Sequence, residues 1–551
     1  MLERLGEIPW DELSHAYGKA TDVPGLLRDL ASSEKAVWDR AIGEFYGNIW
    51  HQGTVYSATA HAVPFLIELL RKHGVVCKPA ILCLLRHLGT GRSYLAVHQG
   101  GDWYRSKRHT DEFRAQLGRE LGYVKAAAAA VAEGTPDYLE LLSDADAEKR
   151  AFAAYTLTVI RGRDEAIEPE LLRRLASEPD PEVRAAVVTA LAKRRRSSTV
   201  RAALSACEER FIATLRKPDE APLVRCVAAL AVIELLGPET LEEALAVVRE
   251  TMTAAGEGLA RMAEFEGASI VDLVGDALSR HPAHQLQWYM ETSQRPEPGF
   301  RKDAVWSMRA LCRRVRSAPQ TVVPRLAEMV ADSDREVRAT AARELPQLGK
   351  ARFLAEPILE RLSDHPDSEV RSAAAETLRA VKSRPPVRTA GEWLGKPRTG
   401  ADPAGLISAL GAEGADHQLI EVVAALELLG PAASEAAPAL RRLLTRDSHW
   451  LRVRAARALW KITGEAEAVL PVLLDEIRAR PAGLVVAEVL AEMGPAAAAA
   501  VPVLRRIISS ETSLVEVGLD HELVDLDEAF HDAAERALSR IESGGRPVEA
   551  E

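Results

Sequence analysis

One motif recurs along the sequence and limits what the chain can fold into: an apolar helix that carries an arginine directly after its first valine. It reads DPEVRAAVVTAL at 180–191, DREVRATAAREL at 334–345 and DSEVRSAAAETL at 367–378. In the first copy, apolar residues recur at i, i+3, i+4, i+7 and i+8 from Val183 to Leu191, which is one face of a helix. A helix cannot bury that face alone, so its repetition predicts that neighbouring units stack.

Prolines near the start of other apolar helices recur with a similar period. The series is Pro136, Pro169, Pro324, Pro357, Pro438, Pro471 and Pro502. The spacing is 33 residues within the pairs 136–169, 324–357 and 438–471, and 31 residues between the last two members. Because proline is tolerated in a first helical turn, each proline is predicted to begin the first helix of a unit. An arginine of the second helix follows 14 to 16 residues later, at Arg150, Arg184, Arg338, Arg371 and Arg454.

The charged residues of the motif have a structural interpretation. Asp180 is placed to cap the second helix, with Pro181 in its first turn. Arg184 then lies at the edge of the apolar face, where its guanidinium can meet carboxylates of its own or the next unit. A catalytic Asp/Arg pair is the alternative, but a residue present in many units is explained more simply as a joint between them.

This pattern resembles the HEAT repeat, in particular the bacterial HEAT-like units related to those of phycobilisome lyases. The resemblance is strong at 136–193, 320–381 and 434–510, and residues 44–66 resemble the leading segment of HEAT-repeat proteins from high-GC bacteria. The 56 arginines against 14 lysines also indicate a bacterial source. The resemblance implies an all-α fold, an α-solenoid built as a superhelix of stacked antiparallel helical hairpins. It implies a surface that binds other molecules and no single activity.

Interruptions of the repeat suggest a domain organisation. We expect divergent helical repeats at 1–134 with a long polar and aromatic insertion at 89–114, central repeats at 135–381, a Pro/Gly-rich linker at 382–405, C-terminal repeats at 406–543 and a tail at 544–551. The insertion is too long for a hairpin turn, and loops of more than about 12–15 residues in a compact array are often functional.

Composition narrows the function. The net charge of −11 argues against a chain whose whole surface binds nucleic acid, and the acidity suits a basic protein partner. Five cysteines without metal-ligand or disulfide spacing indicate a reduced compartment. The N-terminus has no signal-peptide pattern and no uninterrupted apolar run reaches about 18 residues, so we expect a cytoplasmic protein without a membrane segment.

Motifs for catalysis or cofactors are weak. His281 and His284 are separated by a proline, and the metal-ligand types in LDHELVDLDEAFHDA, namely His521, Glu522, Asp525 and His531, are equally explained as an acidic approach to the last helix. Phosphate-binding glycine motifs and a G-x-S-x-G elbow are absent from the sequence. The basic run KRRRSSTVR at 193–201 most simply bridges two helices. We therefore expect no catalytic residue, no bound metal and no cofactor.

The strongest candidate for recognition is the N-terminal quarter. Residues 44–66 and 89–114 hold aromatic and cationic groups that stacking does not require, and their types suit binding hot spots. The candidate partner-binding residues are Trp50, His51, Tyr56, Trp103, Tyr104, Arg105 and Arg108. Two interpretations of 89–114 have equal support, a binding loop and a loop that caps the end of the solenoid.

Two classes of function remain. The first is a non-catalytic protein-binding scaffold that captures a protein partner on its curved surface or on the N-terminal patch. The alternative is a DNA-binding or DNA-glycosylase-like HEAT-repeat enzyme, because a family of bacterial DNA glycosylases is built from HEAT-like repeats. Those enzymes are much shorter and need a cationic groove, whereas this chain is acidic.

Overall fold

A computed structural model describes residues 2–98, 111–197, 206–262, 268–383, 402–410, 416–446, 448–477, 482–513 and 523–543. The chain forms two compact units, Met1–Arg280 and His281–Glu551. This division falls elsewhere than the linker expected at 382–405, which stays a prediction because residues 384–401 lie outside the described part of the chain.

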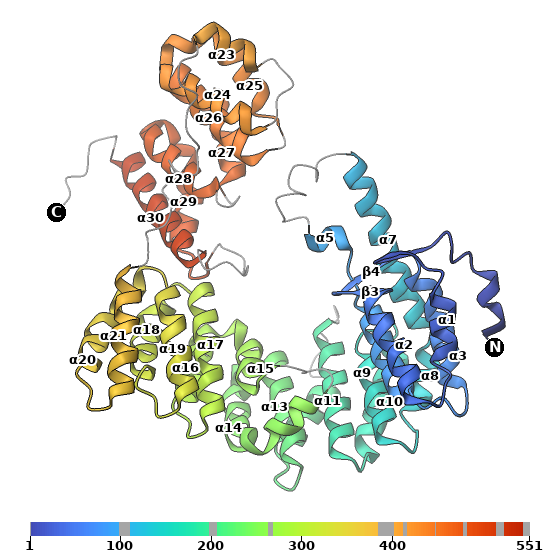
Figure 1. Cartoon of the computed structure of the whole chain (residues 1–551). Coiled ribbons are helices and arrows are strands. Elements are labelled where there is room, and N and C mark those ends of the chain that lie inside the picture. Colours follow the sequence, from blue (N-terminus) through green and yellow to red (C-terminus); the bar gives the residue numbers. More distant parts are fainter. Residues whose placement is uncertain are drawn as a thin grey trace. The chain divides into compact units, whose positions relative to one another are not determined.

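The first unit is a stack of helical hairpins with two short β-hairpins near its start, one before the first α-helix and one between the second and third α-helices (Figure 1). Its elements are η1 (Leu2–Glu7), β1 (Ser14–His15), β2 (Gly18–Lys19), α1 (Val23–Asp29), α2 (Lys35–Gly47), β3 (Trp50–His51), β4 (Thr54–Val55), α3 (Thr59–Arg71), α4 (Lys78–Gly89), α5 (Tyr94–His98), α7 (Asp111–Glu133), α8 (Thr135–Leu141), α9 (Ala147–Leu157), α10 (Asp164–Ser177), α11 (Pro181–Ser197), α12 (Ala206–Leu215), α13 (Pro222–Leu235), α14 (Pro238–Arg261), α15 (Ile270–Ala277) and η2 (Leu278–Arg280). The second helices α4, α9, α11 and α13 pack in that order.

The second unit repeats the same arrangement (Figure 1). Its elements are α16 (Pro282–Thr292), α17 (Pro298–Arg314), α18 (Ala318–Met329), α19 (Arg335–Glu344), η3 (Leu345–Gln347), η4 (Lys350–Ala355), α20 (Glu356–Leu362), α21 (Ser368–Ser383), α23 (Pro403–Leu410), α24 (Asp416–Leu429), η5 (Gly430–Ala436), α25 (Ala437–Leu443), α26 (His449–Thr463), α27 (Ala466–Glu476), α28 (Ala482–Met493), η6 (Gly494–Ala500), α29 (Val501–Ile508) and α30 (Leu523–Glu542). The helices α17, α19 and α21 form one row, and α24, α26, α28 and α30 form another.

The motif arginines are the predicted joints between units, and we call them joint arginines. Asp180 caps α11 by accepting the backbone N–H groups of Glu182 and Val183 at 2.8 and 3.2 Å. Arg184 donates through Nη1 to the carbonyls of residues 178 and 179 and through Nη2 to Glu220 of the next unit at 2.6 Å. The guanidinium therefore ties the turn of its own hairpin to the next one.

Two sequence predictions at these helices need correction. Arg454 is not a joint arginine: Arg452, four residues after the cap Ser448, donates to the carbonyl of Arg446 at 2.8 Å and to Glu476 at 2.6 Å, whereas buried Arg454 lies beside Glu427. The sequence register was shifted because HWLRVR places arginines at both positions.

The prolines do not all begin a helix. Pro136, Pro357, Pro438 and Pro502 do lie in the first turn. The prediction was wrong for three members of the series, because α10, α18 and α27 begin five or six residues earlier, and the proline lies inside each helix: Pro169, Pro324 and Pro471. At that depth a proline removes only one hydrogen bond, from the first part of the helix.

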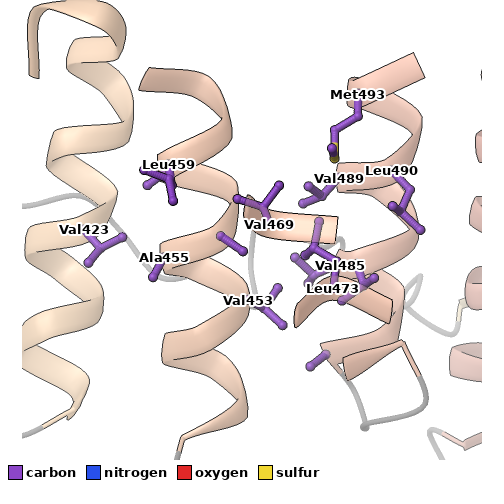
Figure 2. Packing of buried hydrophobic residues seen from close by; sticks show 14 of the residues in the cluster. Val423, Val453, Ala455, Leu459, Val469, Leu473, Val485, Val489, Leu490 and Met493 are labelled. Atoms are coloured by element: carbon purple, nitrogen blue, oxygen red, sulfur yellow. The ribbon is translucent and has the colours of Figure 1, made fainter. Parts of the chain in front are cut away.

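Small aliphatic side chains fill the core. In the second unit, one cluster of buried hydrophobic residues extends from Leu406 to Ile541 and is dominated by alanine, valine and leucine. Figure 2 shows Leu459 of α26, Val469 of α27 and Val489 of α28 within it. Small side chains let neighbouring helices approach closely, which is what a stack of hairpins requires.

One stretch of the described residues, Ala482–Ile508, is long and apolar enough to cross a membrane. It is not an uninterrupted apolar run, because Glu488 and Glu492 lie among its apolar residues. It consists of α28, η6 and α29, and the backbone leaves helical geometry at Ala497. Since 61% of its most apolar part is buried against the rest of the unit, packing in the core accounts for its composition.

Candidate protein-interaction site

A tight hairpin that the sequence analysis did not predict orders the first candidate segment. The strands β3 and β4 pair antiparallel, Trp50 with Val55 and His51 with Thr54. The two turn residues adopt positive φ, 49° at Gln52 and 89° at Gly53. A two-residue turn with positive φ at both positions fits the twist of a hairpin, and a glycine at the second position is its usual signal. The pair Gln52-Gly53 was therefore a sequence signal for this turn.

The second candidate segment begins against that hairpin. Arg92 donates its backbone N–H to the carbonyl of Gly53 at 2.8 Å and accepts from Val55 at 3.0 Å. Buried Glu120 of α7 then accepts the hydroxyl of Ser93 and the N–H of Leu95, both at 2.8 Å, which fixes the start of α5. The described parts of the two segments thus lie together, and α5 shows that 94–98 is helix rather than loop (Figure 1).

Trp50 is held mainly by its own neighbours. Its ring lies 5.4 Å from that of Tyr46 and 5.1 Å from that of His87, and it is half-buried. The Tyr46 hydroxyl is 2.9 Å from Nδ1 of His87. Burial, together with the nearby Arg86, lowers the pKa of His87 to about 4, so the imidazole is neutral at pH 7. This aromatic group packs α2 and α4 together, which is a structural role.

Four other side chains form a more accessible surface, which we call the tyrosine surface: Tyr17, His51, Tyr56 and Tyr94. Tyr17 lies at the turn between β1 and β2, is 71% exposed and meets the His51 ring edge-on at 5.4 Å. Tyr94 is 37% exposed. Burial raises the pKa of Tyr56, its hydrogen bond with Thr54 lowers it, and the acidic groups of Tyr94, Glu120 and Tyr17 raise it further.

The β1–β2 hairpin is held in place by the hydrogen bonds of His15. His15 Nδ1 accepts the backbone N–H of Tyr17 at 3.1 Å, so in the neutral ring Nε2 donates to Asp22, which lies at 3.0 Å. Asp22 also accepts from the Asn48 amide at 2.6 Å. Rigid support of this kind lowers the entropic cost of using Tyr17 as a contact.

Among the candidate residues, Trp50 and His51 lie on β3 and Tyr56 directly follows β4, and each of the three is half-buried. The other four, Trp103, Tyr104, Arg105 and Arg108, lie outside the described residues and stay predictions. Sequence reasoning missed the exposed Tyr17, whereas the exposed Tyr94 belongs to the aromatic and cationic segment 89–114 that it did single out.

In the basic run at 193–201, the described side chains, those of residues 193–196, are engaged within the fold. Arg194 is 1% exposed, donates to two carbonyls of the preceding unit at 2.7 Å and pairs with Asp164. Arg195 and Arg196 lie against glutamates of α12 and α13. Lys193 lines a cavity of about 230 Å³, where burial and the neighbouring Arg86 lower its pKa to about 8. These residues stabilise the stack.

The candidate metal ligands from the sequence are described only in part by the structure. His281 and His284 contact each other with ring centres 6.0 Å apart. The side chains of His521, Glu522 and Asp525 lie outside the described residues. His531 lies near Asp532 and Glu535, with their possible ligand atoms within 4.8 Å, but Lys350 already pairs with Asp532.

A cavity of about 750 Å³ in the second unit is lined by charged groups that neutralise one another. The Arg316 guanidinium contacts both carboxylate oxygens of Asp527, at 2.9 and 3.2 Å, and two carbonyls of residues 507 and 510. This cavity is therefore best explained as a joint between α17 and the end of the unit.

These features define a class, an α-solenoid of stacked helical hairpins without a catalytic constellation among its described residues. The chain carries HEAT repeats, since residues 135–211 and 286–379 match the family model for HEAT repeats, one stretch in each unit. The resemblance to HEAT repeats inferred from the sequence is confirmed for these two stretches, whereas its extension to 434–510 and the bacterial source stay predictions. No protein with a curated description matches the sequence.

The chain is also similar to several solved structures, each at low sequence identity and a low TM-score. An engineered protein is 18% identical with a TM-score of 0.22, and the match covers 95% of this chain and 99% of that one. A structure of Kap95p binding to RanGDP matches at 12% identity and a TM-score of 0.33, over 94% and 67%. Kap121p bound to Pho4p matches at 13% identity and 0.38, over 94% and 55%, so the chain spans just over half of that protein's length.

Proposed function

We propose that the chain is a non-catalytic scaffold that captures a protein partner through the tyrosine surface of its first unit. The observation that carries the proposal is Tyr17, a 71% exposed aromatic side chain on a hydrogen-bonded hairpin, next to His51. The packing of helical hairpins against one another does not require an aromatic ring at position 17. Tyrosine supplies a large contact area at low entropic cost, and it is enriched among residues that dominate binding energy.

A basic segment is the partner chemistry that fits the surroundings. Asp11 and Glu12 are exposed and lead directly into the β1–β2 hairpin. The net charge of −11 adds a long-range attraction for a cationic partner. Cations also bind favourably to the faces of tyrosine rings.

The test is affinity capture of partners by the full chain and by a Tyr17→Ser/Tyr94→Ser double variant. We expect at least tenfold weaker capture by the variant, about 1.4 kcal/mol, with unchanged helical content by circular dichroism. Val76→Ser is the matched control, because Val76 is also exposed, at 53%, and lies in the same unit. A photo-crosslinking residue at position 17 should join the same partner. Equal capture by the double variant would overturn the proposal.

A further inference from the structure

A second surface lies on the helices α17 and α19 of the second unit. Arg301 and Arg338 are joint arginines of the two helices, since each donates through Nη1 to the two carbonyls that lie five and six residues before it. Trp306 and Arg343 each follow their joint arginine by five residues. They therefore occupy the same position in successive repeats, and because α17 packs against α19 they lie side by side.

Trp306 is 40% exposed and is flanked by two guanidiniums. The centre of its ring lies 5.0 Å from Arg343 and 5.5 Å from Arg309. Both arginines also contact the buried Glu344, at 2.8 and 3.0 Å. The shared carboxylate and the indole ring fix the two guanidiniums in place, which lowers the entropy that a ligand must remove.

The charge of this surface is positive although the protein is acidic. Arg309, Arg343 and Glu344 together carry a net positive charge. Arg313 adds a further positive charge and lies two turns along α17 from Trp306. The cations lie in the C-terminal halves of the helices, where the helix dipole favours them. Apart from Glu344, which is paired with both arginines, the acidic residues of the same helices lie towards the N-terminal ends, Asp303 in α17 and Glu336 in α19.

The chain itself shows what such cations bind nearby. Arg316, just beyond α17, holds the carboxylate of Asp527 with two hydrogen bonds, and Lys350 pairs with Asp532. Both acids belong to α30. Arg343, in contrast, remains 58% exposed beside Trp306. Planar guanidiniums recognise carboxylates with two parallel hydrogen bonds, so the exposed Arg343, with the less exposed Arg309 beside it, suits the same chemistry.

We propose that Trp306, Arg309, Arg313 and Arg343, the tryptophan–arginine surface, bind an acidic, extended segment of a partner protein. The carboxylates of that segment pair with the arginines, and its apolar groups or backbone cover the exposed indole. Tryptophan and arginine are the residue types that most often dominate interface energy. This inference does not rest on the tyrosine surface, which lies in the other unit and suits a basic partner.

The experiment measures binding of a fluorescein-labelled octaglutamate peptide to the full chain by fluorescence anisotropy. We expect Trp306→Ala/Arg343→Gln to weaken binding at least tenfold, and binding to fall as salt is raised. Arg173→Gln removes an exposed arginine of the same charge from α10 and should leave the affinity unchanged. Trp38→Ala removes a tryptophan that also lies under a cation, Lys35 at 4.7 Å, and should likewise have no effect.

Three outcomes would overturn the proposal. Equal binding by wild type and the double variant would place the acidic peptide elsewhere. An equal loss in Arg173→Gln would show that only net charge matters. Stronger binding of an octathymidylate strand than of octaglutamate would assign the surface to nucleic acid. Circular dichroism of each variant checks folding, and Arg343→Gln alone, at an exposed side chain, provides a second test if the double variant is unstable.

Discussion

Arg150, Arg184, Arg301, Arg338 and Arg371 make the same pair of backbone hydrogen bonds, while the side chain that each guanidinium meets differs from unit to unit. Arg150 is 8% exposed and contacts both oxygens of Glu178 at 2.9 Å. Arg371 is exposed and donates to two carbonyls at 2.7 Å. Removing one partner of a buried ion pair leaves the other charge buried without its counter-ion. Arg150 should therefore contribute more to stability than the exposed Arg371.

We predict that Arg150→Ala lowers the free energy of unfolding by about 3 kcal/mol and Arg371→Ala by about 1 kcal/mol. Burial alone would raise the pKa of Glu178, but hydrogen bonds from Arg150, the N–H of Asp180 and Arg174 outweigh it and lower the pKa. The stabilisation is therefore present above the unfolded pKa and is lost as pH falls through the folded one. Denaturation by urea at pH 7 and at decreasing acidic pH checks both statements. A pH-independent difference between wild type and Arg150→Ala would contradict them.

At the scale of elements, the short β-hairpins matter because they position the tyrosine surface. The β3–β4 turn depends on Gly53, whose φ of 89° is unfavourable for any side chain, and an added Cβ would lie 3.4 Å from the Arg92 guanidinium. The geometry of the turn therefore also affects the position of Arg92, which pairs with Thr54 and leads into α5.

We predict that Gly53→Ala costs about 1–2 kcal/mol of stability and weakens partner capture, because the hairpin that carries His51 loosens. Gly43→Ala is the control: this glycine is exposed inside α2 with no atom near an added Cβ, so alanine there should stabilise by about 0.4–1 kcal/mol. Thermal unfolding and the capture assay measure both. Identical effects of the two substitutions would mean that the turn geometry is not important.

At the scale of the whole molecule, the repeated motif predicted the α-solenoid. The need to bury one face of each helix against its neighbours explains both the period of the motif and the arginine at the edge of the apolar face. The hairpins were not predicted, since two-residue strands show no alternation and only Gln52-Gly53 marked the turn. The tryptophan–arginine surface was also missed. It depends on the register between α17 and α19, and α17 carries Phe300 before Arg301 where the copies at Arg184, Arg338 and Arg371 have valine.

Stability in such a stack should also be local. Each hairpin contacts mainly its neighbours in sequence, so the free energy is close to a sum over units and their interfaces. Leu459→Ala, at a fully buried position of α26, should cost about 2–5 kcal/mol. We expect amide hydrogen exchange to accelerate in α24 to α28 and to stay unchanged in α9 to α13, while Leu428→Ala, at a 75% exposed side chain, changes neither. Uniform acceleration through both units would show that the chain unfolds as one cooperative body, and the repeats could then not be treated as independent binding platforms.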